Sequence, residues 1–380
     1  AVKGGIFYAK KIVIPATVKQ IDFGGVNWRD KELEVAPGNP VYKVKNNILY
    51  TADGKTVVFS SKQSGTVKIA DGVKTIAGDA FHGSDLTALE LPKSLEKIEK
   101  GAFENCMKLR RIKVSAKNPY MMEKAGALYT KNGKKLLYAG VARGTLMLPK
   151  KTTQIAANAF YGNTTVEMVF IQGKMKKLAK KSLAFSRIKD VTLPDSLLEI
   201  EEGAFMYCSK LADVEIPKSV KKIGANAFDG CYELERVVLP QKLTTLEKET
   251  FRNCYSLRKI DLPKSLRTIK AGTFESCGFN QLVIPKSVKS IGKNALQVTT
   301  KKLIFKGKNV PKIAKQDACQ YGKYAGNTDP DFDLGVVRLD YIDIQYPMQH
   351  GIGKVKVPAE STGKYKKTLK EKMEYRELEY

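Results

Sequence analysis

Apolar residues recur along the chain with a fixed period. Phe205, Phe228, Phe251 and Phe274 lie 23 residues apart, and a cysteine follows each of these phenylalanines by three positions. A constant spacing of this size is typical of proteins whose units stack into a solenoid, because a single unit cannot bury its apolar face alone. The pattern therefore predicts a repeat fold, and repeat folds commonly present an extended binding surface.

Each unit is predicted to contain one short strand and one descending turn. In residues 217–239 the apolar residues Leu234, Val237 and Leu239 have the spacing of a strand whose alternate side chains point inward. A proline then ends the strand, at Pro240 in this unit. The apolar residues earlier in the unit must face the same interior, so that stacked turns share one core.

Two longer segments interrupt the repeats. Residues 39–59 and 118–138 share one pattern, in which two apolar runs flank an Asp-Gly or an Asn-Gly dipeptide. Such dipeptides readily adopt positive φ and close tight turns between paired antiparallel strands. We therefore expect two inserted β-hairpins, within inserts at about 35–69 and 115–148.

The unit consensus, LP-x-S-[LV]-x-x-I-x-x-x-AF-x-x-C-x-x-L-x-x-[IV]-x-[LI], resembles the BspA-like leucine-rich repeat, and recognisable units cover residues 12–305. The resemblance implies a mainly β repeat solenoid with short helical or irregular turns, wound as a right-handed superhelix with a parallel sheet on one face. It also implies a bacterial protein of the cell surface or the secreted fraction, whose role is binding rather than catalysis.

The end of the chain departs from the repeat. We expect residues 1–308 to form the leucine-rich-repeat solenoid, and residues 309–380 to form a degenerate last repeat and a C-terminal cap that shields the end of the stack. The last part of the cap, residues 364–380, is predicted to be a charged helix. The chain begins at Ala1 rather than at methionine, so we expect that a leader was removed or not included.

Six cysteines are the main candidates for metal or redox chemistry. Zinc needs four ligands around one point, whereas thiols at one phase of a repeat form a row. The parallel Cβ directions in such a row also suit a disulfide badly. We therefore expect small buried thiols, with no metal and no cofactor, at the five cysteines that share this phase: Cys106, Cys208, Cys231, Cys254 and Cys277.

Catalytic chemistry finds little support in the sequence. The two histidines, His82 and His350, belong to no nucleophile motif, and no phosphate loop or metal-ligand cluster stands out from the repeat. The Gly-x-Gly at residues 351–353 is too short to count as a phosphate-binding pattern. We therefore expect a protein that is not an enzyme and has no small-molecule substrate.

The charge is the second informative feature, since 66 Lys+Arg against 39 Asp+Glu give a net charge of +27. A regular line of cations can follow a linear polyanion such as a sulfated glycan, a lipopolysaccharide or a nucleic acid. A solvated turn that is merely rich in lysine gives the same pattern. The residues concerned, which we call the lysine column, each follow a repeat proline: Lys93, Lys150, Lys218, Lys264 and Lys286.

The outward positions of the strands form a second candidate surface. They carry mixed charges, among which Arg236 and Lys259 are candidate ligand-binding residues. A nucleic-acid partner is disfavoured, because a stacking platform would interleave aromatic residues with the basic ones. The large aromatic residues of the N-terminal part are either contact anchors or local core: Trp28, Tyr50, Tyr129 and Tyr138.

Two functions remain open at this stage. The first is a non-catalytic binding or adhesion protein, at the cell surface or secreted, that contacts host extracellular matrix proteins or other cell-surface macromolecules. The alternative is a polyanion binder that uses the lysine column. The sequence leaves the oligomeric state open.

Overall fold

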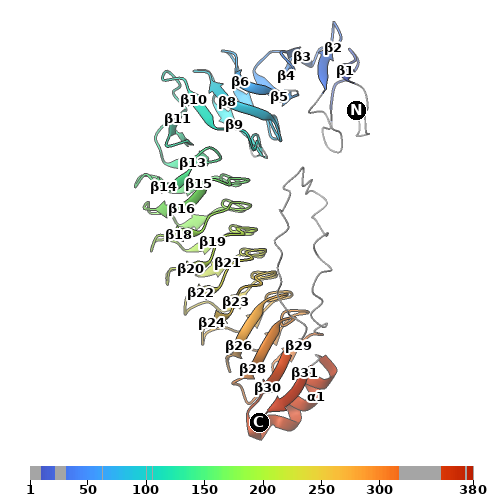
Figure 1. Cartoon of the computed structure of the whole chain (residues 1–380), viewed down its shortest axis with the longest axis vertical. Coiled ribbons are helices and arrows are strands. Elements are labelled where there is room, and N and C mark those ends of the chain that lie inside the picture. Colours follow the sequence, from blue (N-terminus) through green and yellow to red (C-terminus); the bar gives the residue numbers. More distant parts are fainter. Residues whose placement is uncertain are drawn as a thin grey trace. The chain divides into compact units, whose positions relative to one another are not determined.

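Figure 1 shows the computed structural model of the chain, which divides into two compact units. Unit 1 comprises Ala1–Arg143 and Ala156–Asn163, and unit 2 comprises Gly144–Ile155 and Thr164–Tyr380. The structure describes residues 10–21, 31–61, 63–99, 101–104, 106–315, 352–372 and 375–379.

Unit 1 is built from short strands. Parallel pairing joins β6, β8 and β10 in one sheet, and β5, β7 and β9 in a second. The strands are β1 (Lys11–Ile14), β2 (Glu32–Val35), β3 (Tyr42–Lys45), β4 (Ile48–Thr51), β5 (Thr56–Ser60), β6 (Ser64–Lys68), β7 (Thr75–Ile76), β8 (Asp85–Leu91), β9 (Lys97–Ile98), β10 (Arg111–Val114), β11 (Met121–Lys124), β12 (Ala127–Thr130) and β13 (Lys135–Tyr138).

The two interrupting segments of unit 1 contain its antiparallel pairs. Strand β4 pairs with β3 and β5, and β12 pairs with β11 and β13. Gly54 and Gly133 connect the later strands of each segment at φ values of 74° and 69°, a conformation that glycine adopts without steric cost.

Unit 2 repeats a two-strand turn, and Figure 1 shows these turns following one another. One set of strands forms the parallel sheets β14-β16-β18 and β20-β22-β24, and a second set, of two-residue strands, forms the parallel sheets β17-β19-β21 and β23-β25-β27-β29. The strands are β14 (Gly144–Leu148), β15 (Gln154–Ile155), β16 (Val166–Ile171), β17 (Lys177–Leu178), β18 (Asp190–Thr192), β19 (Glu199–Ile200), β20 (Asp213–Glu215), β21 (Lys222–Ile223), β22 (Arg236–Val238), β23 (Thr245–Leu246), β24 (Lys259–Ile260), β25 (Thr268–Ile269), β26 (Gly278–Ile284), β27 (Ser290–Ile291), β28 (Thr299–Phe305), β29 (Lys312–Ile313), β30 (Ile352–Lys356) and β31 (Tyr375–Glu379).

The core of unit 2 is a stack of identical side chains. The rings of Phe205 and Phe228 lie 4.9 Å apart, those of Phe228 and Phe251 lie 5.4 Å apart, and those of Phe251 and Phe274 lie 5.9 Å apart. All four rings are buried and nearly parallel, as one phase of a stacked repeat requires. The predicted mainly β repeat solenoid with parallel sheets is thus confirmed.

The cysteines of the repeat are buried free thiols, as predicted. In unit 2 the Sγ atoms of Cys231, Cys254 and Cys277 donate to phenylalanine carbonyl oxygens of the preceding turn at 3.2, 3.1 and 3.0 Å. Burial raises the pKa of Cys208 to about 12, so its thiolate is strongly disfavoured. These thiols therefore stabilise the stack by hydrogen bonds between turns.

The C-terminal part of unit 2 corrects one prediction. A short 3-10 helix, η1 (Ala359–Ser361), leads into α1 (Thr362–Lys372), and the chain then forms β31 rather than more helix. Strand β31 pairs in parallel with β30, which itself pairs with β28. The predicted charged helix over 364–380 is therefore wrong beyond Lys372, because the alternating residues 375–379 extend the parallel sheet.

Three residues with candidate roles in the sequence lie outside the described ranges, namely Trp28, His350 and the sixth cysteine, Cys319. The boundary at residue 308 stays a prediction, as does the right-handed winding. In the described part of the chain, no helix is both long and apolar enough to cross a membrane.

Candidate functional site

The five lysines of the lysine column all lie on exposed turns. Lys93 belongs to unit 1 and the other four belong to unit 2. In unit 2 each turn that carries one of these lysines is closed by the same hydrogen bond. The backbone N–H of the third residue after the proline donates to the proline carbonyl oxygen. Asp195 and Gln241 occupy the equivalent position in two turns, so the column is interrupted in this unit.

Two lysines of the column, Lys264 and Lys286, line a hollow in unit 2 with a volume of about 950 Å³. We call it the basic groove. Three further cations line it, together with one carboxylate from Asp261. Its charged lining is therefore strongly unbalanced, and the cations are Lys264, Arg267, Lys286, Lys289 and Lys306.

Consecutive turns of the solenoid position these cations. Lys289 donates its backbone N–H to the carbonyl oxygen of Arg267 at 2.8 Å, and Lys312 donates to that of Lys289 at 2.8 Å. Successive turns are therefore in register along the groove. Since strands of a sheet lie about 4.8 Å apart, cations on neighbouring turns repeat along one direction.

The far wall of the groove is held by the C-terminal cap. A Cβ added at Gly307 would lie 3.3 Å from Lys286 Cα, so the two turns pack closely at this point. The hydroxyl of buried Tyr365 donates to the carbonyl oxygen of Gly307 at 2.8 Å, and Lys308 pairs with Glu360 at 2.8 Å. The cap thus fixes the turn that carries Lys306.

Several lysines in or beside the two-residue strands of unit 2 are neutralised by carboxylates, whereas the column lysines, inside and outside the groove, have no ion pair among the described residues. Glu199 pairs with Lys177 at 2.7 Å and with Lys222 at 2.9 Å, and Glu247 neutralises a third lysine in the same way. The structure gives no ion pair, within the described residues, to the four lysines of the groove. Their positive charge is therefore available to a ligand.

A smaller basic hollow of about 530 Å³ lies in unit 1. It lies beside β10 and is lined by Arg111, Lys113, Lys131 and Glu123 among others. Arg110 also lines it, but its Nη1 donates to the carbonyl oxygen of Met107 at 2.6 Å. This hollow is less suited to an anion than the basic groove, because it has fewer cations without partners and because Glu123 lies among them.

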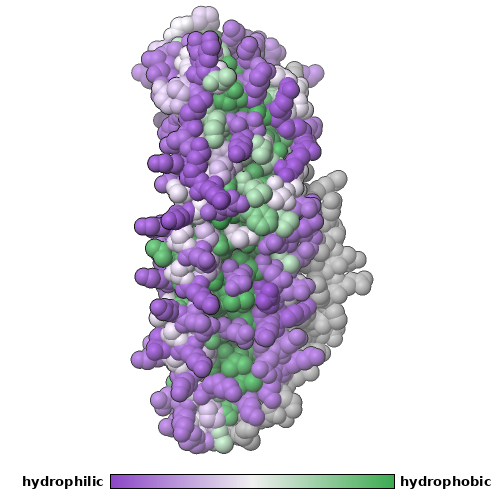
Figure 2. All heavy atoms as spheres, turned by 90° about the vertical axis from the view of Figure 1, so that its left-hand side faces the viewer, coloured by the Kyte–Doolittle hydropathy of each residue, from purple (hydrophilic) through white to green (hydrophobic). Residues whose placement is uncertain are grey.

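The strand face of unit 2, by which we mean the outward positions of β14 to β24, carries mixed side chains. Arg236 lies in register with Asp213 and with Lys259, and its Nε donates to Asp213 at 2.9 Å. Among these charges, Met147 is 58% exposed and Val238 is 39% exposed. Figure 2 shows hydrophilic side chains that border hydrophobic and neutral ones on this side of the molecule.

The tyrosines of the interrupting segments are core residues rather than contact anchors. Tyr50 and Tyr129 are buried, and burial raises the pKa of both. Tyr138 is half-buried, lies 5.2 Å from the ring of Phe103 and donates its hydroxyl to the Phe103 carbonyl oxygen at 3.4 Å. The local-core alternative is therefore correct for these three residues.

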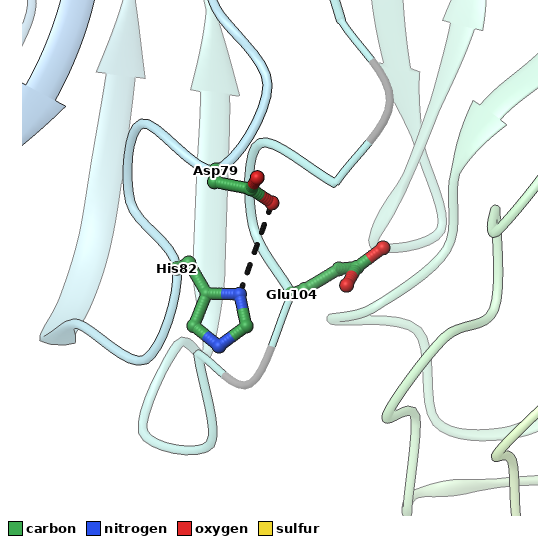
Figure 3. Close-up of side chains that lie close together, drawn as sticks. All are labelled: Asp79, His82 and Glu104. Atoms are coloured by element: carbon green, nitrogen blue, oxygen red, sulfur yellow. Dashed lines mark ion pairs between the residues drawn. The ribbon is translucent and has the colours of Figure 1, made fainter. Parts of the chain in front are cut away.

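One group of three potential metal ligands occurs among the described residues, in unit 1 (Figure 3). The ligand atoms of Asp79, His82 and Glu104 lie within 4.8 Å of one another. The sequence did not indicate this cluster, because Asp79 and His82 lie in one turn and Glu104 lies in the next. Asp79 lies 3.8 Å from His82 Nδ1, and Glu104 accepts a 2.8 Å hydrogen bond from Asn158. We interpret the group as a link between turns, because Glu104 is already engaged.

Unit 2 also contains a charged network that the sequence did not reveal. Asp229 is 0% exposed, and Arg252 donates to its two carboxylate oxygens at 2.6 and 3.2 Å. Asn253 and Asn226 donate to the same carboxylate, and Arg252 also pairs with Glu249 at 3.2 Å. Burial raises the pKa of Asp229 although Arg252 lowers it. The network stabilises the stack and is too enclosed to receive a ligand.

The comparisons with known proteins concern the whole chain. A family model described as "BspA type Leucine rich repeat region" matches six copies over residues 55–127, 130–255 and 182–303. No curated protein matches the sequence.

Three bacterial proteins are among the solved structures that resemble the chain. A leucine-rich repeat protein from Eubacterium ventriosum has a TM-score of 0.49 at 17% identity, with 75% of each chain covered. The pneumococcal vaccine antigen PcpA has a TM-score of 0.47 at 16% identity, with 98% of this chain and 79% of PcpA covered. A leucine-rich cell surface protein from Faecalibacterium prausnitzii has a TM-score of 0.39 at 17% identity, with 71% of this chain and 89% of that one covered.

Proposed function

Since the chain belongs to the family of proteins with the BspA-type leucine-rich repeat, we propose that it is a non-catalytic binding protein. We place it at a bacterial cell surface or in the secreted fraction, where the strand face of unit 2 contacts protein ligands of host matrix or of other cells. Neither a cofactor nor a small-molecule substrate is part of this proposal.

The observation that carries the proposal is the composition of the strand face. Protein interfaces combine apolar contact area with a polar rim, and charges are depleted at their centre. Exposed Met147 and Val238 supply apolar area, and the paired charges of Asp213 and Arg236 lie on the strands beside Val238. Because the register of the parallel strands fixes these positions, the surface is rigid and loses little conformational entropy on binding.

The test uses two substitutions at residues of equal exposure. Val238 on the strand face and Leu198 outside it are both 39% exposed. We expect Val238→Glu to weaken binding to immobilised fibronectin and to epithelial cells at least tenfold, because a carboxylate would be desolvated in the interface. Leu198→Glu is the matched control and should bind like the wild-type protein.

Surface plasmon resonance at physiological salt measures the fibronectin interaction, and flow cytometry measures attachment of the labelled protein to the cells. Equal binding by the two variants would exclude the strand face as the contact surface. Failure of the wild-type protein to bind either target would contradict the proposed adhesion function.

A further inference from the structure

We propose that the basic groove of unit 2 is a binding site for a sulfated linear glycan. This inference goes beyond the protein-binding role of the strand face, and it concerns a different surface. It also rests on different residues, so that the two can succeed or fail separately. The geometry and the charge of the groove carry the argument.

The first step is the unbalanced charge of the lining. Five cationic side chains and one carboxylate line a hollow of about 950 Å³, which lies within the range of about 300–1,000 Å³ typical of ligand sites. Cations gathered in one hollow repel one another, and an anionic ligand removes this repulsion. Among the described residues no carboxylate pairs with Lys264, Lys286, Lys289 or Lys306, whereas carboxylates do pair with Lys177, Lys222 and Lys270 of the same unit.

The second step is an uncommitted hydroxyl in the lining. Ser265 of the preceding turn donates to the carbonyl oxygens of Gln241 and Leu243 at 2.7 and 2.6 Å. The equivalent Ser287 lines the groove, and its buried Oγ has no hydrogen-bond partner in the described part of the chain. A buried hydroxyl without a partner costs free energy. A sulfate oxygen in the groove would accept a hydrogen bond from it.

The third step distinguishes between classes of polyanion. Cations on consecutive turns repeat along one direction, which suits a linear polymer rather than a compact anion. The lining contains no aromatic side chain: beside its charged residues it consists of aliphatic, proline, serine and asparagine side chains. Single-stranded nucleic acids are usually held by stacking of bases on aromatic rings. A sulfated glycan, which offers anionic groups and hydroxyls but no bases, therefore fits the groove better.

The experiment uses heparin as the probe and compares two variants with the same change in charge. Lys264→Glu/Lys286→Glu changes two column lysines inside the groove, whereas Lys150→Glu/Lys218→Glu changes two column lysines outside it. All four side chains are exposed, so both variants should keep the wild-type midpoint of urea unfolding. The comparison therefore distinguishes binding in the groove from a general effect of net charge.

We expect the groove variant to bind heparin at least 100-fold more weakly than the wild-type protein, and the outside variant to stay within threefold. In a salt titration, Lys264→Gln/Lys286→Gln should lower the slope of log K against log salt by about two, since each lost contact releases about one counterion fewer. Desulfated heparin and single-stranded DNA should bind more weakly than heparin.

Equal losses of heparin affinity in the two glutamate variants would contradict binding in the groove and would favour diffuse attraction by the net charge. Absence of heparin binding by the wild-type protein at low salt would also overturn it, and DNA binding stronger than heparin binding would exclude the glycan. Fibronectin binding of the groove variant, measured in parallel, reports on the strand face alone. Its persistence or loss therefore leaves the two proposals distinguishable.

Discussion

Replacement of Arg252 by methionine isolates the energetic role of the buried network of unit 2. Methionine keeps most of the aliphatic packing of arginine but removes the guanidinium that donates to both oxygens of Asp229. The carboxylate, which is 0% exposed, then keeps only the side-chain amides of Asn253 and Asn226 as donors. The variant therefore leaves a buried charge without its counter-charge.

The magnitude follows from the two hydrogen bonds that are lost. A hydrogen bond to a charged group contributes about 1.5–3 kcal/mol, and removal of one partner of a buried ion pair costs about 3–5 kcal/mol. Because two amides still donate to Asp229, we expect the lower end of this range, a loss of about 3 kcal/mol in the free energy of unfolding at pH 7. Loss of the guanidinium should raise the pKa of Asp229 further in the variant, because burial then acts without the counter-charge of Arg252.

The sign of the pH dependence follows from this shift. Burial already raises the pKa of Asp229 in the folded state above its usual value of 3.8. In Arg252→Met the folded protein therefore binds a proton that the unfolded chain has released, over the pH range between 3.8 and the raised pKa. The variant should recover stability relative to the wild-type protein as the pH falls through this range, and lose it as the pH rises.

Urea unfolding between pH 4 and 8, monitored by circular dichroism, measures this difference. The double variant Asp229→Asn/Arg252→Met is the control, because it removes both charges and should restore at least half of the lost free energy. A double-mutant cycle with Asp229→Asn then gives the coupling energy of the pair. The reasoning is refuted if Arg252→Met unfolds within about 0.5 kcal/mol of the wild-type protein at pH 7, or if its deficit does not depend on pH.

The other predictions concern the stack, the thiols and the cap. Phe251→Ala should cost about 3–5 kcal/mol in urea unfolding because it opens a cavity between two stacked rings, whereas exposed Tyr120→Ala should cost less than about 0.5 kcal/mol. In a Cys319→Ala variant, Ellman's reagent at pH 8 should modify no thiol until urea is added, since the five remaining cysteines are buried; fast reaction in the folded state would contradict their burial. Tyr365→Phe should cost about 1–2 kcal/mol because the Gly307 carbonyl oxygen loses its donor, and an unchanged unfolding midpoint would show that the cap does not depend on this contact.

The sequence predicted the repeat well because the repeat is set by burial, which acts at every turn alike. The phase of Phe228 and Cys231 was sufficient to place both side chains in the core. The C-terminal cap was predicted less well. Residues 375–379 form a strand because β30 presents a free edge, and pairing with that edge is a tertiary effect that local charge does not indicate.

The candidate sites were harder to predict, because they depend on which turns deviate from the repeat. The proline-lysine pattern identified Lys264 and Lys286, but it gave the same weight to Lys218, which does not line the groove. Arg267 and Lys306 lacked any pattern of their own. Asp229 and Arg252 lie 23 residues apart, so the repeat period itself was the signal that could have paired them.

The distribution of acids contributes to the excess of positive charge in the last turns of unit 2. On the ladder of two-residue strands, Glu199 lies in register with Lys222 and pairs with it, and Glu247 pairs with Lys270. After Glu247 the corresponding segments, residues 268–273, 290–295 and 312–315, contain no acidic residue. Lysines continue to follow the prolines in these turns, so cations outnumber acids around the basic groove. Part of the net charge of +27 is therefore concentrated in one hollow, which five cations and one carboxylate line.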